Sequence, residues 1–244
     1  MESFNFNKPP EATPSQERTP VKDGVVNVFE KHPELLALGT PEEYSRYLDT
    51  IFPESKLHEI VYHGTASQDK IEAFDFKKSN YAQAVFFTKN KAFAESFAFD
   101  DVRNGSVQEQ MLDIKNTFDF SNPEHVAGLR EIIAELVREG YKSSTGIRFH
   151  NNLPEITIGE KTIQNPTLED FVEHYMWRLN HGSWRIIETD RIVDFISKKY
   201  DSIQIVERGN TNIAVFSGNQ IHVLGSAADI EKFKSFTHKD TPGK

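Results

Sequence analysis

The segment that most constrains the fold is Val61-Tyr62-His63-Gly64-Thr65, in which an apolar strand ends in polar residues. The apolar residues Ile60 and Val61 indicate a β-strand, and a glycine at the end of a strand marks a close approach of the backbone to another group. Because side chains alternate along a strand, His63 and Thr65 lie on one face. An imidazole, a hydroxyl and a bare peptide group suit a ligand with hydroxyls and an amide. An ordinary strand end followed by a turn is the alternative interpretation.

Composition is typical of a globular protein with one domain. The chain has 244 residues, of which 37% are hydrophobic and 27% charged, enough for a substantial core. It contains no cysteine, which excludes disulfides and thiolate metal ligands. The formal net charge of −9 disfavours a protein that coats nucleic acid, because an acidic surface repels phosphate; a local basic groove stays possible.

Targeting and metal motifs are missing from the sequence. No apolar run approaches the ~20 residues of a membrane helix, and Met1-Glu2-Ser3-Phe4-Asn5 lacks the features of a signal peptide. The nine histidines are scattered, and no glycine-rich phosphate loop is present. We therefore expect a cytoplasmic monomer that binds neither a membrane nor a metal ion.

The order of the predicted elements indicates an α+β fold, because strands joined by turns alternate with blocks of helices. Residues 1–25 are polar and proline-rich, so we expect a disordered tail, followed by a single domain at 26–235 and a flexible C-terminal tail at 236–244. Apolar spacing predicts helices at 41–52, 89–99, 126–139, 168–179 and around 192–196, and strands at 56–65, 84–88, 107–114, 202–206, 213–216 and 221–224. Turns at Gly209-Asn210 and Gly218-Asn219 join the last three strands, residues 118–122 form a connector, and residues 141–166 form an insertion or a loop that faces a target.

Several short motifs follow one another in an order that resembles one family. They are Tyr62-His63-Gly64-Thr65, Val85-Phe86-Phe87-Thr88 with Phe97 eleven residues after Phe86, Trp184-Arg185-Ile186-Ile187-Glu188, Tyr200-Asp201-Ser202-Ile203 and the segment from Ile213 to Ile221. In this order they resemble the ADP-ribosyltransferases of the diphtheria-toxin and PARP-like group, which carry a His-Tyr-Glu triad. The closest resemblance is to the ADP-ribosyltransferase domain of bacteriophage polyvalent proteins, over residues 41–226. It implies a split antiparallel β-sheet core with inserted helices.

The resemblance also implies that NAD is bound as a substrate, without a metal. In the family, the histidine and the hydroxyl after the glycine hold the ribose, the glycine backbone holds the carboxamide, and two aromatic rings enclose the nicotinamide. By position these are His63, Thr65, Gly64, Phe86 and Phe97, and the wider predicted NAD-binding set adds Tyr62, Phe87 and Thr88. Phe86 stands where the triad has a tyrosine and keeps a ring without the hydroxyl. Core packing of these phenylalanines is the alternative.

Asn212 stands where the resemblance places the triad glutamate, so the predicted catalytic residues are His63, Phe86 and Asn212. An amide can bond a ribose hydroxyl, but it supplies no negative charge and no base at neutral pH. Glu207, five residues earlier, is the alternative for the acidic position. The interpretation of Asn212 as an ordinary residue beside a turn also stays open.

The resemblance implies a NAD-dependent mono-ADP-ribosyltransferase, a glycosyltransferase that acts as a toxin or effector. It would transfer ADP-ribose from NAD to a host macromolecule and release nicotinamide, in the host cytoplasm if a phage encodes it. The acidic charge favours a protein acceptor over a nucleic acid. Two other functions stay open: a module of the same fold that binds NAD, ADP-ribose or a partner protein with little or no catalysis, and a NAD-dependent enzyme that acts on RNA or DNA termini.

Overall fold

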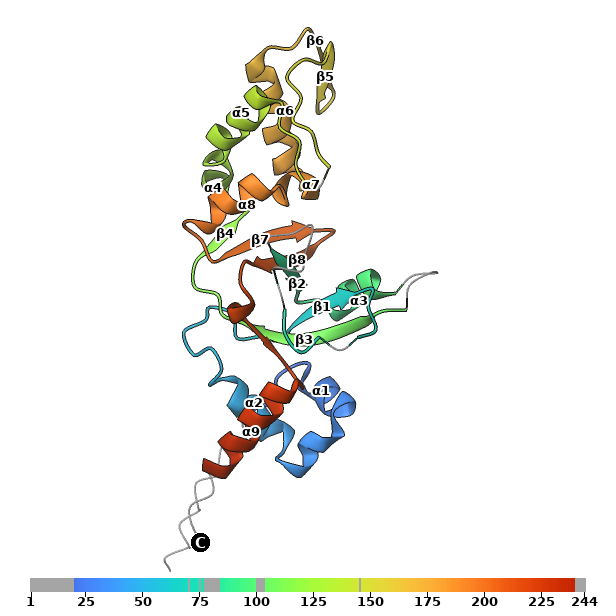
Figure 1. Cartoon of the computed structure of the whole chain (residues 1–244), viewed down its shortest axis with the longest axis vertical. Helices are drawn as coiled ribbons and strands as arrows, with labels where there is room; N and C mark the ends of the chain where they lie inside the picture. Colours follow the sequence, from blue (N-terminus) through green and yellow to red (C-terminus); the bar gives the residue numbers. More distant parts are fainter. Residues whose placement is uncertain are drawn as a thin grey trace, which may run out of the picture.

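The computed structural model describes residues 20–69, 71–74, 76, 84–99, 104–144 and 146–239. These residues form three parts along the long axis of the molecule: a central sheet, an upper lobe of residues 123–197, and a lower lobe of residues 20–48 and 227–239 (Figure 1). No helix in the described ranges has the length and apolar content needed to cross a membrane.

The central sheet carries the segment with which the sequence analysis began. Its seven strands, as far as the chain is described, have the order β4-β7-β8-β2-β1-β3-β9. Their bounds are β1 Val61–Thr65, β2 Val85–Thr88, β3 Ser106–Leu112, β4 Thr117–Asp119, β7 Ser202–Glu207, β8 Asn210–Val215 and β9 Ile221–Val223. Helix α3, Lys91–Ala98, packs against β1 and β3 (Figure 1). The predicted α+β fold is confirmed.

The sheet divides between β1 and β2. These strands pair at one position only, Tyr62 with Thr88, whereas β1 pairs with β3 over five positions, from Val61 with Gln110 to Thr65 with Ser106. Beyond Tyr62 the two central strands therefore separate, and this gives the split that the family resemblance implied.

Two connections at the edges of the sheet differ from the prediction. The expected connector at 118–122 contains part of β4, which pairs in parallel with β7. Strand β9 pairs with β3 and not with β8, because the 3₁₀ helix η2, Gly218–Gln220, carries the chain to the far edge of the sheet. Arg208 and Gly209, both with positive φ, form the turn between β7 and β8.

The core of the upper lobe continues onto strands β7 and β8 of the central sheet. Its elements are α4 Pro123–Ala127, α5 Arg130–Glu139, β5 Glu155–Ile158, β6 Lys161–Gln164, α6 Leu168–Asn180, α7 Trp184–Ile187 and α8 Asp190–Ser197. The apolar face of α5, including Leu136 and Val137, packs with Phe171 and Tyr175 of α6. The region 141–166, expected to be an insertion or a loop that faces a target, contains the β5–β6 hairpin.

The lower lobe corrects both predicted tails. It consists of α1 Val25–Lys31, η1 Pro33–Ala37, α2 Pro41–Leu48 and α9 Ala227–Lys239. Val25 is fully buried and Val21 packs on the same core, so the predicted disordered tail does not extend to residue 25. Helix α9 continues to Lys239, and Phe236 also packs on this core. Residues 1–19 and 240–244 lie outside the described residues.

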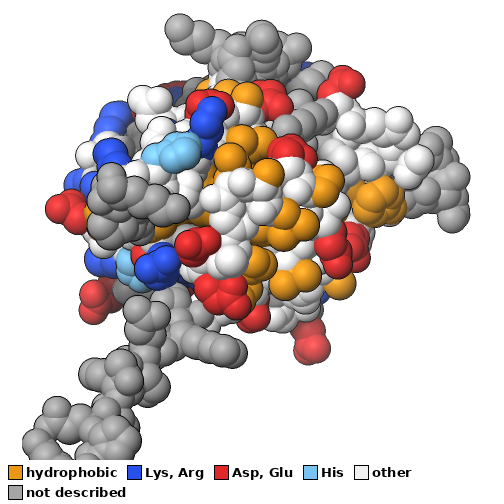
Figure 2. All heavy atoms as spheres, turned by 90° about the horizontal axis from the view of Figure 1, so that it is seen from below, with side chains coloured by type: hydrophobic (Ala, Val, Ile, Leu, Met, Phe, Trp, Pro, Cys, Tyr) orange, Lys and Arg blue, Asp and Glu red, His pale blue; other side chains and the backbone are white. Residues whose placement is uncertain are grey.

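The outer face of the lower lobe is partly apolar. Hydrophobic side chains gather on it among acidic ones (Figure 2), and Val26 of α1 and Leu36 of η1 are exposed by 56% and 65%.

Candidate functional site

A cavity of about 350 Å³ contains the residues that surround the split between β1 and β2. The residues that line it are Tyr62, His63, Gly64, Phe86, Phe87, Thr88, Phe93, Ala94, Phe97, Glu188, Glu207 and Asn212. They come from β1, β2, α3, β7, β8 and the end of α7. Of the predicted site residues, Thr65 alone is not among them. We name it the NAD cavity, after the predicted ligand.

His63 is held by backbone and aromatic contacts. Its Nδ1 lies 2.9 Å from the carbonyl oxygen of Phe86; because a carbonyl only accepts, Nδ1 carries the proton and donates. The ring lies edge to face with Phe74, with 5.2 Å between the ring centroids, and 5.5 Å from the ring of Phe87. Burial lowers the pKa of the imidazole, so His63 is neutral near pH 7. Its Nε2 has no hydrogen-bond partner among the described residues and can accept one from a ligand hydroxyl.

Gly64 is required by packing as well as by its expected role at the ligand. A Cβ atom at this position would lie 2.0 Å from the backbone oxygen of Ala94. Helix α3 therefore approaches β1 more closely than any other residue at position 64 would permit. This contact holds α3, with Phe93 and Phe97, against the cavity.

The three predicted phenylalanines have different environments. Phe97 is 47% exposed and contacts Phe93 edge to face, with 5.1 Å between ring centroids. Phe86 is half-buried and also packs on the upper core. Phe87 is 1% exposed and lies against His63, so it supports the imidazole from within the core. Of these three rings, Phe86 and Phe97 are the more exposed.

Three other predicted residues have structural partners. The ring of Tyr62 belongs to the lower core and is 8% exposed. The hydroxyl of Thr65 accepts a hydrogen bond from Ser67 N at 3.3 Å. The hydroxyl of Thr88 accepts one from Asn90 N at 3.2 Å, at the start of α3. Their observed contacts stabilise the strands and turns around the cavity.

Asn212 and Glu207 lie side by side. Asn212 Nδ2 donates to Glu207 Oε2 at 3.2 Å; the reverse orientation of the amide would place two acceptors together, so this assignment is the physical one. Asn212 is 4% exposed, and its Oδ1 is buried without a partner. Such an acceptor costs about 1–3 kcal/mol unless something donates to it. The two candidates for the acidic position thus belong to one site, with an unsatisfied oxygen beside them.

Glu188 is a charged residue of the cavity that was not among the predicted site residues. It follows α7 directly, in the Trp-x-x-x-Glu motif, and its side chain is half-buried. Burial raises the pKa of its carboxyl, and the negative charge of Glu207 raises it further. Neither glutamate forms an ion pair with a described residue. Raised carboxyl pKa values in a cleft are typical of functional sites, and the motif was the available signal.

The arrangement can bind and polarise an organic ligand. It combines a neutral imidazole, an amide, two carboxylates in different environments and aromatic surface. Within the described residues, no three His, Asp or Glu side chains are grouped so as to hold a metal ion. The geometry thus provides hydrogen bonds, stacking and negative charge.

Comparison with known proteins assigns the chain to a family. Among curated proteins, none matches it. A solved structure described as "Crystal structure of an anti-CRISPR protein" aligns over 67% of this chain and 93% of that chain, with 15% identity and a TM-score of 0.31, too low to bear on fold or function. The family model described as "ADP-Ribosyltransferase in polyvalent proteins" matches residues 58–229, which include every residue of the NAD cavity. The chain belongs to this family of ADP-ribosyltransferase domains.

Proposed function

We propose that the protein is a NAD-dependent mono-ADP-ribosyltransferase that transfers ADP-ribose from NAD to a host macromolecule. Family membership supports a transferase. The single observation that carries the proposal is the meeting of His63, Glu188, Glu207 and Asn212 in one cavity with aromatic walls. Those groups match the needs of a reaction in which nicotinamide leaves ribose and positive charge develops on the sugar.

Binding would place the nicotinamide ring against Phe86 and Phe97 and a ribose hydroxyl at His63 Nε2. Stacking against the aromatic rings buries the leaving group, and the fixed imidazole orients the sugar. The unpartnered Oδ1 of Asn212 would accept a hydrogen bond from a hydroxyl or carboxamide of NAD. NAD would therefore satisfy the atom that the free protein leaves unsatisfied.

The two glutamates have different roles in the reaction. The bond between nicotinamide nitrogen and ribose carbon breaks, nicotinamide leaves with the electron pair, and Glu207 stabilises the cationic sugar. The acceptor nucleophile then bonds to that carbon, and its proton passes to Glu188, whose raised pKa makes it a stronger base than an ordinary carboxylate. Asn212 holds Glu207 in place. In this assignment Asn212 and Glu207 replace the single triad glutamate as a pair.

Transfer of a single unit, as proposed, requires that neither Asn212 nor the two glutamates deprotonate a ribose hydroxyl of the attached ADP-ribose. Chain growth requires that a ribose hydroxyl be deprotonated to act as the next nucleophile, and Asn212 cannot take that proton.

The test is incubation of the protein with labelled NAD and a host-cell lysate, with nicotinamide release and product length measured together. We expect nicotinamide release and labelled acceptors that carry one ADP-ribose. Glu207→Gln should abolish both, whereas Glu160→Gln, an equal change of charge at an exposed turn, should change neither. Polymer from the parent protein would contradict single transfer.

A binding module is the second candidate, because Phe86 and Asn212 stand where the family triad has tyrosine and glutamate. In that case calorimetry would detect NAD binding while nicotinamide release stays at the uncatalysed rate.

A further inference from the structure

A second cavity, in the upper lobe, is lined by basic side chains. It has a volume of about 350 Å³, and its polar lining includes Arg148, His150, His174, Arg178 and Arg185. No Asp or Glu is among its described lining residues. A cluster of three arginines and two histidines contrasts with the formal net charge of −9 of the whole chain. We name it the basic cavity.

Its arginines differ from others in the same lobe. Arg130 is paired with Glu169 and Glu173, and Arg191 with Glu135 and Glu139. Neither Arg148 nor Arg178 forms an ion pair with any described residue. Since arginine charges on an acidic protein readily find carboxylates, two such arginines at one cavity point to an external anion.

Contacts within the lobe fix the walls of the basic cavity. The hydroxyl of the buried Tyr175 donates to the Arg148 carbonyl at 2.9 Å and accepts from His150 N at 2.7 Å. The guanidinium carbon of Arg178 lies 5.8 Å from the centre of the Tyr175 ring. His174 Nδ1 donates to the Thr157 carbonyl at 2.8 Å. One buried tyrosine thus joins the loop and helix α6 that carry the basic groups.

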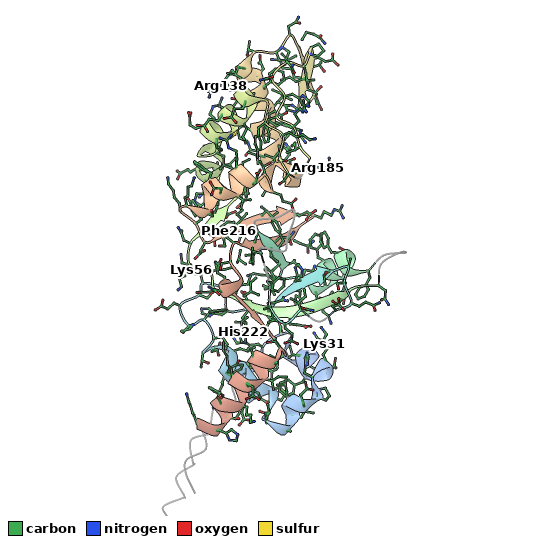
Figure 3. The ribbon with its side chains drawn as sticks, in the orientation of Figure 1. Lys31, Lys56, Arg138, Arg185, Phe216 and His222 are labelled. Carbon is green, nitrogen blue, oxygen red and sulfur yellow. The ribbon has the colours of Figure 1, made fainter. Side chains whose placement is uncertain are left out.

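The basic cavity and the NAD cavity share one short element. Arg185 of α7 lines the basic cavity, and Glu188, three residues later, lines the NAD cavity. With a rise of about 1.5 Å per residue, their backbones are one helical turn apart. Arg185 lies where the upper lobe meets the sheet (Figure 3). A ligand in the basic cavity would therefore continue toward the reacting centre.

We propose that the basic cavity binds the terminal phosphate monoester of a single nucleic-acid strand and so presents that strand as the acceptor. A phosphate monoester carries close to two negative charges and several acceptor oxygens, which suit the two arginines without carboxylate partners better than one carboxylate does. The exposed Arg185 suits the next phosphodiester along the strand, which a singly phosphorylated peptide lacks.

This proposal identifies the class of acceptor for the proposed transferase. The role as acceptor therefore rests on the proposed function, whereas the binding of the strand does not. The phosphate serves as a handle and not as the nucleophile. The sequence favoured a protein acceptor because of the net charge. At the basic cavity, the local positive charge matters more than the net negative charge of the chain, because screening confines charge effects at a surface to about 8–10 Å.

Fluorescence anisotropy in the absence of NAD tests the binding step. The probes are two ten-nucleotide RNA strands of one sequence, labelled at the 3′ end, one with a 5′-phosphate and one with a 5′-hydroxyl. We expect the phosphorylated strand to bind the parent protein about tenfold more tightly at low salt. Arg178→Gln and Arg148→Gln should each remove this preference and reduce the slope of log affinity against log salt by about 0.7.

Arg138→Gln is the matched control. Arg138 is an exposed arginine of α5 that lies on the opposite side of the upper lobe from Arg185 (Figure 3), and its substitution should keep the preference for phosphate. Because Arg178 packs on Tyr175, thermal unfolding should accompany the assay. Arg148 is exposed, so Arg148→Gln tests the cavity without that complication.

Several results would overturn the proposal. Equal affinity for the two strands would refute a terminal phosphate site, as would equal losses in Arg138→Gln and Arg178→Gln. Displacement of the strand by AMP at the strand's own affinity would show a free-nucleotide site, and equally tight binding of a singly phosphorylated peptide would refute the nucleic-acid assignment. Nicotinamide release, measured on the same variants, is independent: its absence in all of them would refute the transferase and leave the binding result intact.

Discussion

Two buried clusters contain acidic side chains, and they differ in whether those side chains have partners. The Asp229 cluster, in the lower lobe, consists of Tyr44, Tyr47, His222 and Asp229. Asp229 is fully buried, and its carboxylate accepts hydrogen bonds from both tyrosine hydroxyls, from His222 Nε2 and from Gly225 N, the last two at 2.7 Å. Burial and the Asp229 charge raise the pKa of both tyrosines, so both remain donors.

The cavity cluster, made of Glu188, Glu207 and Asn212, has few partners. Its carboxylates have no described cation, and its amide keeps one buried oxygen unpaired. A fully bonded carboxylate joins α2 to α9 and stabilises the fold, whereas a partly bonded one lowers stability and leaves hydrogen-bonding capacity for a ligand. Four experiments distinguish these roles.

Asp229→Ala should have the largest effect, on stability. It would remove the carboxylate that accepts from the hydroxyls of Tyr44 and Tyr47 and from His222 Nε2, at a cost of about 4 kcal/mol in the free energy of unfolding. Urea denaturation measures this loss. Asp229→Asn keeps one acceptor oxygen and should cost less. A loss below about 1 kcal/mol for the alanine variant would mean that the cluster is not a major support of the fold.

Substitution of the histidine in the NAD cavity and of the histidine in the Asp229 cluster should have opposite effects on turnover and stability. His63→Ala should reduce nicotinamide release by about 100-fold while the protein stays folded, because the ribose loses its orienting group. His222→Ala should lower the free energy of unfolding and leave turnover per folded molecule unchanged at low temperature. Steady-state kinetics and denaturation of both variants give the comparison. Unfolding of the His63 variant would instead identify a core histidine.

Asn212→Ala should lower turnover about tenfold, the effect of one lost hydrogen bond. Asn212→Glu should not raise turnover, because Glu207 already lies at hydrogen-bond distance from Asn212 and would repel a second carboxylate. Initial rates of nicotinamide release decide the matter, and unchanged rates in both variants would remove Asn212 from the site.

Glu188→Gln should have the smallest effect on stability, and the effect should be favourable. Because the folded pKa of Glu188 is raised above its ordinary 4.5, the folded state binds the proton more tightly, and stability falls as pH rises above 4.5. Removal of the charge should raise the Tm by roughly 2 °C at pH 7 and lower turnover. The difference in Tm should vanish near pH 4, where both states hold the proton. Glu160→Gln, an equal change of charge at an exposed turn, is the control.

Much of the local structure was predictable. The Thr40 hydroxyl accepts from Glu43 N at 3.2 Å, and Glu43 accepts from Thr40 N at 2.8 Å, as their capping pattern predicts. The spacing of apolar residues likewise placed α5 and α6. Strand β4 was missed because it has only three residues and its parallel partner follows much later in the chain.

The sequence predicted those residues of the candidate site that belong to the family motifs. His63, Gly64, Phe86 and Asn212 were identified through their order in the chain, and Glu188 was quoted within a motif without a role. No sequence motif indicated the basic cavity. Its side chains come from a loop, α6 and α7, and each is surrounded in the sequence by residues that do not line the cavity.

By itself, the sequence determined five of the helices, most strands of the central sheet and the family motifs, because capping, periodicity and glycine geometry act between residues that are close in the chain. Only the tertiary structure decided which polar groups have partners. His63 and Glu188 stand 125 positions apart in the sequence and line one cavity only because β1 and the end of α7 pack around the same split in the sheet. Charge and unsatisfied hydrogen bonding depend on such neighbours in space, so two glutamates and one asparagine of ordinary sequence context become a site through packing alone.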